Sequence, residues 1–185
     1  CESCDGLGVD SFFDPTRVVT DASLSLPGGA IRGWDRRNAY YFQMLKALCE
    51  HYKFDLDLPF ENLPEAIRKV ILYGSGDEQI TFSYLSERRG GYTRTHSFEG
   101  ILPNMERRYK ETESTLVREE LAKFLGSRPC PTCSGERLSR SARHVLVGEH
   151  RLPTLTAYPI GSVYELFEKL NLPGQRGEIA AKIIK

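Results

Sequence analysis

The stretches "CESCDGLG" at residues 1–8 and "CPTCSGER" at residues 130–137 share the pattern Cys-x-x-Cys-x-Gly. In each stretch the two cysteines stand close enough to bind one metal ion, and the glycine permits the tight backbone turn behind them. A structural zinc site needs four such ligands in a tetrahedron. The pattern therefore predicts that the two stretches meet at one closed metal site, although 125 residues separate Cys4 from Cys130.

The long segment between the two cysteine turns is compatible with one site if its ends lie close together. The entropy cost of closing a loop grows only logarithmically with its length, and a bound metal holds the ends in place. The segment also carries helical and strand patterns of its own. We therefore predict an α+β domain at residues 14–120, inserted into a second domain formed by residues 1–13 and 121–185.

Three other interpretations of the four cysteines stay open. Two disulfides are typical of small secreted domains, and the sequence shows no secretory leader. A redox motif of the thioredoxin kind requires Cys-x-x-Cys between a strand and a helix, a setting that neither turn is expected to have. Each pair could also bind a metal together with an outside partner. The fifth cysteine, Cys49, is interpreted as a small core residue rather than a nucleophile.

Hydrophobic periodicity predicts the elements of the inserted domain. A helix is expected over residues 36–52, with Asp35 as its cap. A second helix, or a pair of helices, is expected to begin at Asn104 and to continue to Leu125. Runs of strand-forming residues separated by turn signals predict a three-stranded antiparallel meander, with strands over residues 69–73, 79–85 and 91–98.

The residues after the second cysteine turn predict one short strand and two helices. The strand is expected at residues 144–147, and a capping box formed by Ser162 and Glu165 is expected to open a helix that reaches residue 171. A further helical stretch starts at residue 174. The predicted fold class is α+β, a small antiparallel sheet with helices that interrupts a mostly helical, zinc-binding domain.

Composition excludes several classes of function. The chain of 185 residues carries 25 basic and 25 acidic side chains, which argues against a uniformly basic nucleic-acid binder but not against a local basic face. No run of about 18 apolar residues is present to span a membrane. We find no phosphate-loop motif, Ser-His-Asp set or histidine cluster, so this stretch is not expected to be an enzyme.

The cysteine usage predicts a reducing, cytosolic setting. An apolar helix face that continues to the last residues predicts a piece of a longer protein.

Arginines gather in three places along the chain. Between residues 126 and 144, four arginines stand against Glu136, and a spacing of three would stack some of them on one side of a helix. Cations placed in this way could bind phosphate groups. The alternative is that these arginines belong to a solvated face, with ordinary helical pairs such as Glu106–Lys110 and Glu119–Lys123. The candidate DNA-contacting residues are Arg88, Arg89, Arg107, Arg108, Arg137, Arg140 and Arg143.

Six segments carry a resemblance to a known family: "CESCDGLG", "AIRGWDRRNAYYFQMLKAL", "HYKFD", "FEGILPNMERRYKETES", "REELAKF" and "RPCPTCSGERL". Together they resemble the UvrA family, the damage-recognition subunits of UvrABC excinucleases. The resemblance implies a zinc-bearing signature domain in the first ATP-binding-cassette half, interrupted by an insertion domain. It also implies that the two domains act as a clamp on distorted duplex DNA, which is indirect readout. The zinc ligands that it implies are Cys1, Cys4, Cys130 and Cys133.

The resemblance further implies functions that lie outside these residues. The Walker A, Walker B and Leu-Ser-Gly-Gly motifs of the family are not found in this sequence. The binding and hydrolysis of ATP, the pairing with a second UvrA and the binding of UvrB therefore belong to the rest of a longer parent protein. The implied setting is DNA repair in the bacterial cytoplasm, by nucleotide excision and within the SOS response.

Two rival functions remain from other classes. The first turn also fits the Cys-x-x-Cys-x-Gly-x-Gly repeat of DnaJ-like chaperone cofactors, but that family needs four repeats and has no such long insertion. The second turn has Glu136 and Arg137 where the repeat would end on glycine. A purely structural scaffold, which binds zinc but not DNA, is the other rival.

Overall fold

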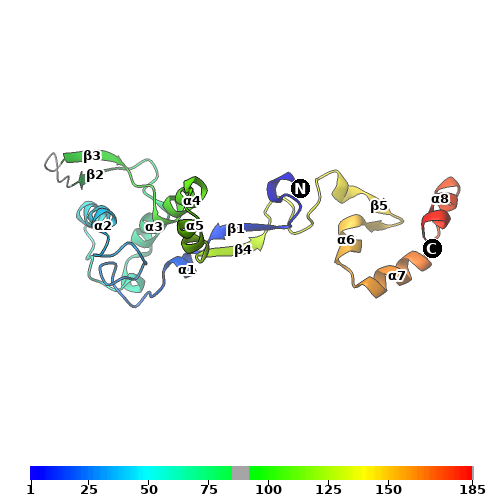
Figure 1. Ribbon diagram of the computed structural model, residues 1–185, viewed down its shortest axis with the longest axis horizontal. Coiled ribbons are helices and arrows are strands. Elements are labelled where there is room, and N and C mark those ends of the chain that lie inside the picture. Colours follow the sequence, from blue (N-terminus) through cyan, green and yellow to red (C-terminus); the bar gives the residue numbers. More distant parts are fainter. Residues whose placement is uncertain (85–91, 185) are drawn as a thin grey trace. The chain divides into compact units, whose positions relative to one another are not determined.

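The computed structural model describes residues 1–84 and 92–184 (Figure 1). The chain forms two compact units. The terminal unit comprises Cys1–Ser11 and Ser127–Lys185, and the central unit comprises Phe12–Gly126. The helices and short antiparallel strands of these units confirm the α+β fold class. The assignment of a signature domain and an insertion domain to particular residues stays a prediction.

The central unit is mainly helical and carries one hairpin. Its elements are α1 (Pro15–Val18), α2 (Ala39–Tyr52), a 3-10 turn (Phe60–Asn62), α3 (Glu65–Tyr73), β2 (Gln79–Tyr84), β3 (Tyr92–Ser97), α4 (Ile101–Glu111) and α5 (Thr115–Ala122). The boundary between the units falls within two paired strands, β1 (Val9–Phe13) and β4 (Leu125–Pro129).

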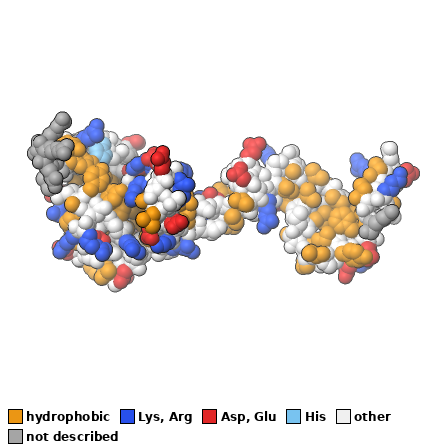
Figure 2. Space-filling model, viewed as in Figure 1, with side chains coloured by type: hydrophobic (Ala, Val, Ile, Leu, Met, Phe, Trp, Pro, Cys, Tyr) orange, Lys and Arg blue, Asp and Glu red, His pale blue; other side chains and the backbone are white. Residues whose placement is uncertain are grey.

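The terminal unit begins with the first cysteine turn and ends with three helices. Its elements are a 3-10 turn (Glu2–Cys4), a second 3-10 turn (Ala142–His144), β5 (Leu146–Val147), β6 (His150–Arg151), α6 (Leu152–Ala157), α7 (Ile160–Glu168) and α8 (Gln175–Ile183). In the space-filling view, hydrophobic side chains gather on the surface over α6, α7 and α8 (Figure 2). Among the described residues, no helix has the length and apolar character needed to cross a membrane.

The predicted strand at residues 69–73 is wrong, because these residues form the end of α3. The run is uniformly apolar and short, so its period alone does not distinguish a strand from a buried helix. The helix begins at Glu65, directly after Pro64, and this start places Ile67 and Ile71 one turn apart on the side that faces the core. Within the described residues the predicted meander is therefore a two-stranded sheet of β2 and β3.

The predicted start of the first long helix is also wrong. The cap of α2 is Asn38, whose side-chain oxygen accepts a hydrogen bond from the backbone N–H of Tyr41 at 3.2 Å. Asp35 lies upstream of the helix and accepts from the backbone N–H of Arg37 at 2.9 Å and from its guanidinium at 2.6 Å. This partner lowers the pKa of the Asp35 carboxyl to about 2.

Other helix boundaries differ from the prediction for local reasons. Helix α4 begins after Gly100, so Asn104 lies inside it, and Ser114 caps the separate helix α5. Residues 125–129 form β4 rather than the end of a helix. Helix α7 begins after Pro159, so Ser162 lies within its first turn and the predicted capping box is not formed.

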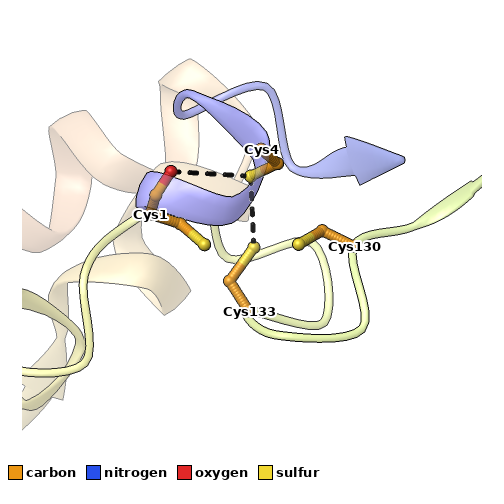
Figure 3. A group of neighbouring side chains, drawn as sticks. All are labelled: Cys1, Cys4, Cys130 and Cys133. Atoms are coloured by element: carbon orange, nitrogen blue, oxygen red, sulfur yellow. Dashed lines mark hydrogen bonds between the residues drawn. The ribbon is translucent and has the colours of Figure 1, made fainter. Parts of the chain in front are cut away.

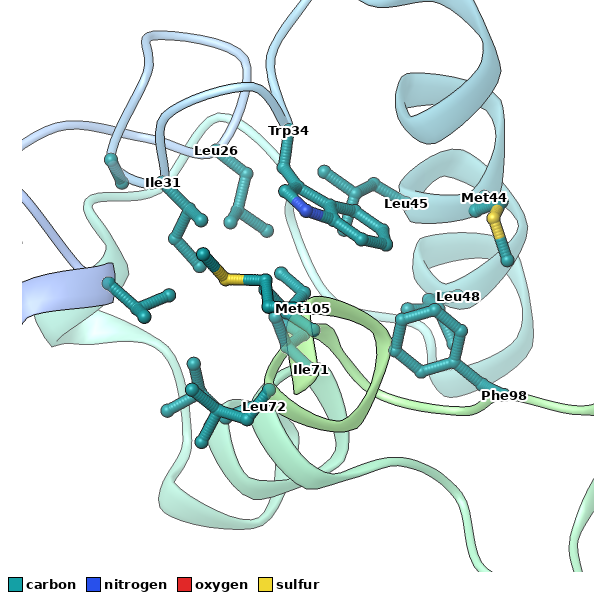
Figure 4. Packing of buried hydrophobic residues seen from close by; sticks show 14 of the residues in the cluster. Leu26, Ile31, Trp34, Met44, Leu45, Leu48, Ile71, Leu72, Phe98 and Met105 are labelled. Carbon is teal, nitrogen blue, oxygen red and sulfur yellow. The ribbon is translucent and has the colours of Figure 1, made fainter. Parts of the chain in front are cut away.

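The hydrophobic core of the central unit joins α2, α3 and α4 to the loop that precedes α2 (Figure 4). Leu45 and Leu48 of α2, Ile71 of α3 and Phe98 after the hairpin are at most 2% exposed, and Trp34 is 3% exposed. The core therefore gathers side chains from distant parts of the sequence, and it supports one face of the β2–β3 hairpin.

A candidate metal centre and the cations around it

Four cysteine sulfurs converge in the terminal unit (Figure 3). The Sγ atoms of Cys1, Cys4, Cys130 and Cys133 all lie within 4.8 Å of one another, and the last three side chains are buried. The Sγ atoms of Cys4 and Cys133 are 3.7 Å apart. A tetrahedron with metal–sulfur bonds of about 2.3 Å has sulfur–sulfur edges of about 3.8 Å, so this spacing fits a bound metal. All five cysteines are free, which does not support the disulfide interpretation.

The two cysteine turns repeat the same backbone conformation. In each turn, the first, second and fourth residues after the second cysteine have positive φ. These residues are Asp5, Gly6 and Gly8 in the first turn, and Ser134, Gly135 and Arg137 in the second. The left-handed region favours glycine, because a side chain there approaches the following carbonyl. Arg137 adopts a φ of 66°, where its counterpart Gly8 has 78°, so the second turn keeps the shape without the glycine.

Reciprocal backbone hydrogen bonds hold the turns together. The carbonyl of Gly8 accepts from the nitrogen of Cys130 at 2.9 Å, and the carbonyl of Arg137 accepts from the nitrogen of Cys1 at 2.7 Å. The Gly8 N–H also donates to the Cys4 sulfur at 3.3 Å. A Cβ at Gly8 would lie 2.9 Å from the carbonyl oxygen of Gly135, so this position has no room for a side chain.

The pKa values of two of the thiols are shifted in opposite directions. The backbone N–H of Cys133 lowers the pKa of Cys130 to about 7, whereas burial raises the pKa of Cys4. Four thiol donors with a closed, largely buried arrangement fit a structural metal and leave no position for a substrate. The second turn directly follows β4, but the next element after it is the short 3-10 turn Ala142–His144 rather than a helix, so the thioredoxin setting is not formed.

The run of arginines beside the second turn is not helical, which corrects the prediction. The described residues 137–141 form no helix, and only Ala142–His144 makes a short 3-10 turn. Arg143 is largely buried, donates to Glu136 at 3.3 Å and also donates to the carbonyl of Thr132 inside the turn. Arg143 therefore supports the turn. Arg137 and Arg140 are exposed, and neither has an acidic partner among the residues that the structure describes.

The basic residues of α4 also differ in whether a carboxylate binds them. Arg107 is bound by Glu99 at 2.8 Å and by Glu111 at 3.2 Å, and Glu99 raises its pKa above the ordinary value. Arg108 lies 5.8 Å from the ring centroid of Tyr41. The predicted pair Glu106–Lys110 is present at 2.7 Å. The other two predicted candidates of the central unit, at positions 88 and 89, lie outside the described residues.

Two further predictions concern single residues. Lys123 pairs with Glu120 rather than with the predicted Glu119, and it lies directly after the last residue of α5. Cys49 is partly buried in α2, donates to the carbonyl of Phe54 at 2.7 Å, and has its pKa raised by burial. This environment suits a small structural side chain.

One exposed cation and its neighbours were not among the predicted sites. Arg94 lies on β3, and its partner in the register of the hairpin is Phe82. It shares a hairpin face with Tyr84 and Tyr92, which alternate with polar residues along β2 and β3. This period of two was visible in the sequence, but the third tyrosine beside them, Tyr40, comes from α2 and carries no such signal.

Comparisons with known proteins agree on one family. A family model described as the UvrA DNA-binding domain matches residues 14–123. The UvrABC system protein A of Xylella fastidiosa (strain 9a5c) is 60% identical over 185 residues, which are 100% of this chain and 19% of that protein. The protein of the same name from Escherichia coli (strain K12) is 58% identical, again over the whole chain and 20% of that protein. The chain thus spans about a fifth of the length of these relatives.

A solved structure supports the same fold. The crystal structure of UvrA2 from Deinococcus radiodurans superimposes with a TM-score of 0.65 and 23% identity, over 100% of this chain and 25% of that one. The family match covers the central unit almost entirely, and the cysteine turns flank it on both sides. On this evidence the chain belongs to the UvrA family.

Proposed function

We propose that the four cysteines hold one structural zinc ion that anchors a DNA-binding segment of a nucleotide excision repair protein. The proposal rests on one observation: two cysteine turns at the ends of a segment matching a DNA-binding domain model converge on one closed set of four sulfurs. Soft thiolate ligands in a tetrahedron select zinc over hard cations such as magnesium. The zinc offsets half of the charge of the four thiolates and fixes the ends of the segment.

In this proposal, one domain binds the metal and both domains contact DNA. Residues 1–13 and 121–185 form the zinc-binding signature domain, and residues 14–120 form the insertion domain. Both domains contact duplex DNA through phosphate groups, with a preference for distorted or damaged duplex, because a deformed duplex is cheaper to bend into a clamp. Phosphate contacts position the protein without reading base sequence.

The sequence proposed phosphate contacts from the positions of the arginines alone. The ion pairs that the arginines make with carboxylates support a smaller set of contacts. An arginine already held by a carboxylate must break that pair before it binds a phosphate. Arg107 and Arg143 are held in this way, whereas Arg137 and Arg140 are exposed without an acidic partner among the described residues. Arg108 packs over an aromatic ring and keeps its charge available. We therefore assign the strongest phosphate contacts to Arg108, Arg137 and Arg140.

The remaining functions are proposed for the longer parent protein. The relatives are named as protein A of the UvrABC system, and the chain covers about a fifth of their length. We propose that the parent binds ATP and hydrolyses it elsewhere, pairs with a second copy and with UvrB, and acts in the bacterial cytoplasm. This segment contributes DNA contact and no catalytic residue.

The experiment that tests the proposal measures metal content and DNA binding on the same protein. Zinc per chain is determined by elemental analysis, and binding of a fluorescent duplex is followed by anisotropy at two salt concentrations. The test variant is Arg137→Gln/Arg140→Gln. The matched control, Lys69→Gln/Lys110→Gln, removes the same charge from lysines that already pair with Glu65 and Glu106. We expect one zinc per chain, and a slope of log affinity against log salt that falls by roughly 0.9 per lost phosphate contact in the test variant only.

The alternative outcomes point to the rival functions. One zinc without any affinity for duplex favours the structural scaffold. Zinc with affinity for unfolded polypeptide instead of DNA favours the chaperone-like module. A chain that binds no zinc when folded contradicts the metal site itself. Equal weakening by the test and control variants leaves DNA binding in place but removes Arg137 and Arg140 from the contact surface.

A further inference from the structure

A row of aromatic rings leads from the core of the central unit to its surface. It starts at Phe82, which is 1% exposed and stacks on the ring of His96 at 4.5 Å. Tyr84 continues the row, stacked on Tyr92 at 5.2 Å and on Tyr40 at 5.9 Å. We call Tyr40, Tyr84 and Tyr92 the tyrosine row. Its outer members, Tyr40 and Tyr92, are 56% and 54% exposed.

The hairpin places the tyrosine row by its register. Tyr84 pairs with Tyr92 and Phe82 pairs with Arg94, so all four side chains lie on the same face of the sheet. The opposite face is polar, with the hydroxyls of Thr81 and Thr95 2.9 Å apart. The aromatic face is the one whose lower part, at Phe82, is buried in the core. The tyrosine row is thus the exposed extension of a buried sheet face.

The central ring of the row is fixed by a hydrogen-bond chain. His96 Nδ1 lies 2.7 Å from the carbonyl oxygen of Ser97, which can only accept, so Nδ1 carries the proton. In the neutral ring Nε2 then accepts from the Tyr84 hydroxyl at 2.9 Å. Burial raises the pKa of Tyr84, which keeps this hydroxyl protonated as a donor. A ring held on both sides in this way is preorganised, so binding a ligand costs little ordering.

Cations accompany the exposed rings. Arg94 is exposed on the face of the tyrosine row, and the described part of the chain offers it no acidic partner within 4 Å. Arg108 lies over Tyr41, whose ring is 5.3 Å from that of Tyr40. In the space-filling view, hydrophobic side chains come to the surface beside the hairpin, with basic side chains next to them (Figure 2). Flat aromatic faces next to cations match a ligand that is itself flat and carries negative charge.

We propose that Tyr40 and Tyr92 stack against nucleobases that have left the stack of a distorted DNA duplex, while Arg94 contacts a neighbouring phosphate. Every base has a flat π face, so aromatic stacking accepts any sequence. A paired base inside a regular duplex cannot reach the tyrosine row, because both of its faces are already covered by neighbouring pairs. The row therefore favours DNA in which bases are unpaired. This inference rests on the proposed DNA-binding function and names the chemical group that this surface recognises.

The test compares two DNA molecules of equal length and charge. One is a fully paired duplex, and the other contains a central unpaired segment with the fluorescent base 2-aminopurine. The zinc-loaded full chain is assayed as wild type, as Tyr40→Ala/Tyr92→Ala and as Tyr40→Phe/Tyr92→Phe. The control is Tyr73→Ala, because Tyr73 is 57% exposed on α3, outside the tyrosine row. The fluorescence of Trp34, the single tryptophan, confirms that each variant keeps its core.

The expected result separates the variants by DNA type. Wild type, the phenylalanine variant and the Tyr73 control quench 2-aminopurine and bind the unpaired DNA more tightly. The alanine variant loses the quenching and binds the unpaired DNA about tenfold or more weakly, with the paired duplex changed less than about twofold.

Three different results would overturn the inference. If wild type binds both DNA molecules and the alanine variant binds them equally well, DNA binding stands and the stacking surface is refuted. If wild type binds neither DNA, the proposed DNA-binding function fails together with the inference. Loss of affinity for a partner protein alone, with DNA binding unchanged, would assign the tyrosine row to a protein interface instead.

Discussion

The two units of this chain are stabilised by different means. The central unit buries a continuous hydrophobic cluster that includes Trp34, Leu45, Leu48 and Ile71. In the terminal unit the described cluster of buried residues consists of Cys4, Cys130 and Cys133, with Cys1 packed against it. Several large apolar side chains of the terminal helices remain exposed, among them Ile160 at 89% and Ile183 at 76%. The four converging cysteines, the candidate metal ligands, therefore stand where the central unit has apolar burial.

Because they are stabilised differently, the two units should respond to different perturbations. Burial of apolar area is spread over many side chains, so the loss of one weakens the central unit in part. A metal site concentrates its free energy in four bonds, so the loss of one ligand removes most of it at once. Two separate probes make this visible, since Trp34 reports only on the central unit and a cobalt–thiolate absorbance band reports only on the cysteines.

The largest expected effect is the loss of the metal. Because zinc binding to such sites is linked to folding by about 10–16 kcal/mol, Cys133→Ser or removal of zinc with a chelator should unfold the region around the two turns. Amide hydrogen exchange should rise throughout residues 1–11 and 127–140, while the urea midpoint of Trp34 fluorescence stays unchanged. The matched control is Cys49→Ser, which keeps a donor to the Phe54 carbonyl and should retain the metal. If the central unit unfolds when the metal is lost, the two units are not stabilised independently.

An intermediate effect is expected from the core of the central unit. Leu48 is fully buried on α2, so Leu48→Ala removes packed atoms and leaves a cavity, which lowers the free energy of unfolding by about 2–5 kcal/mol. Urea titration followed by Trp34 fluorescence measures the change. Leu116→Ala, at a position that is 68% exposed on α5, should change it by less than about 0.5 kcal/mol. Cobalt absorbance should be the same in both variants, and a weakened metal site in Leu48→Ala would show that the units are energetically coupled.

The smallest effects should distinguish the two cysteine turns from each other. Gly8→Ala places a Cβ 2.9 Å from a backbone oxygen at positive φ, so it should weaken metal affinity and stability by about 1–3 kcal/mol. Arg137→Gly relieves a non-glycine residue at φ 66° and should strengthen the site by up to about 1 kcal/mol. Competition with a chromogenic zinc chelator measures both.

Gly8→Ala and Arg137→Gly are expected to change zinc affinity in opposite directions, which makes the two variants informative together. Arg137→Gly should bind zinc more tightly and DNA more weakly, since it removes strain and a proposed phosphate contact together. Arg137→Ala serves as the control that loses the charge but keeps the strained backbone. If Arg137→Gly weakens zinc binding as much as Gly8→Ala does, the two turns are not equivalent in the way their backbones indicate.

Local patterns in the sequence were sufficient for the elements with a clear period or motif. The two Cys-x-x-Cys-x-Gly turns identified all four converging sulfurs, because ligand type and spacing are local properties. The alternation predicted strands over residues 79–85 and 91–98, within which β2 and β3 lie, and the apolar spacing after Gly174 predicted α8. The fold class followed from these elements.

Features that depend on distant residues could not be predicted from local patterns. The run at residues 69–73 is a helix because its apolar side chains meet the core from one side, which a short apolar run does not reveal by its period. The division of arginines into paired and available ones depends on partners such as Glu99 and Glu136, whose proximity follows from the fold.

The tyrosine row shows the same limit most clearly, because α2 supplies Tyr40 and the two strands supply Tyr84 and Tyr92. The order of amino acids shows which chemical groups are present and how each short segment prefers to fold. The tertiary structure decided which groups share a surface, because contacts between segments far apart in the chain depend on the packing of the whole core.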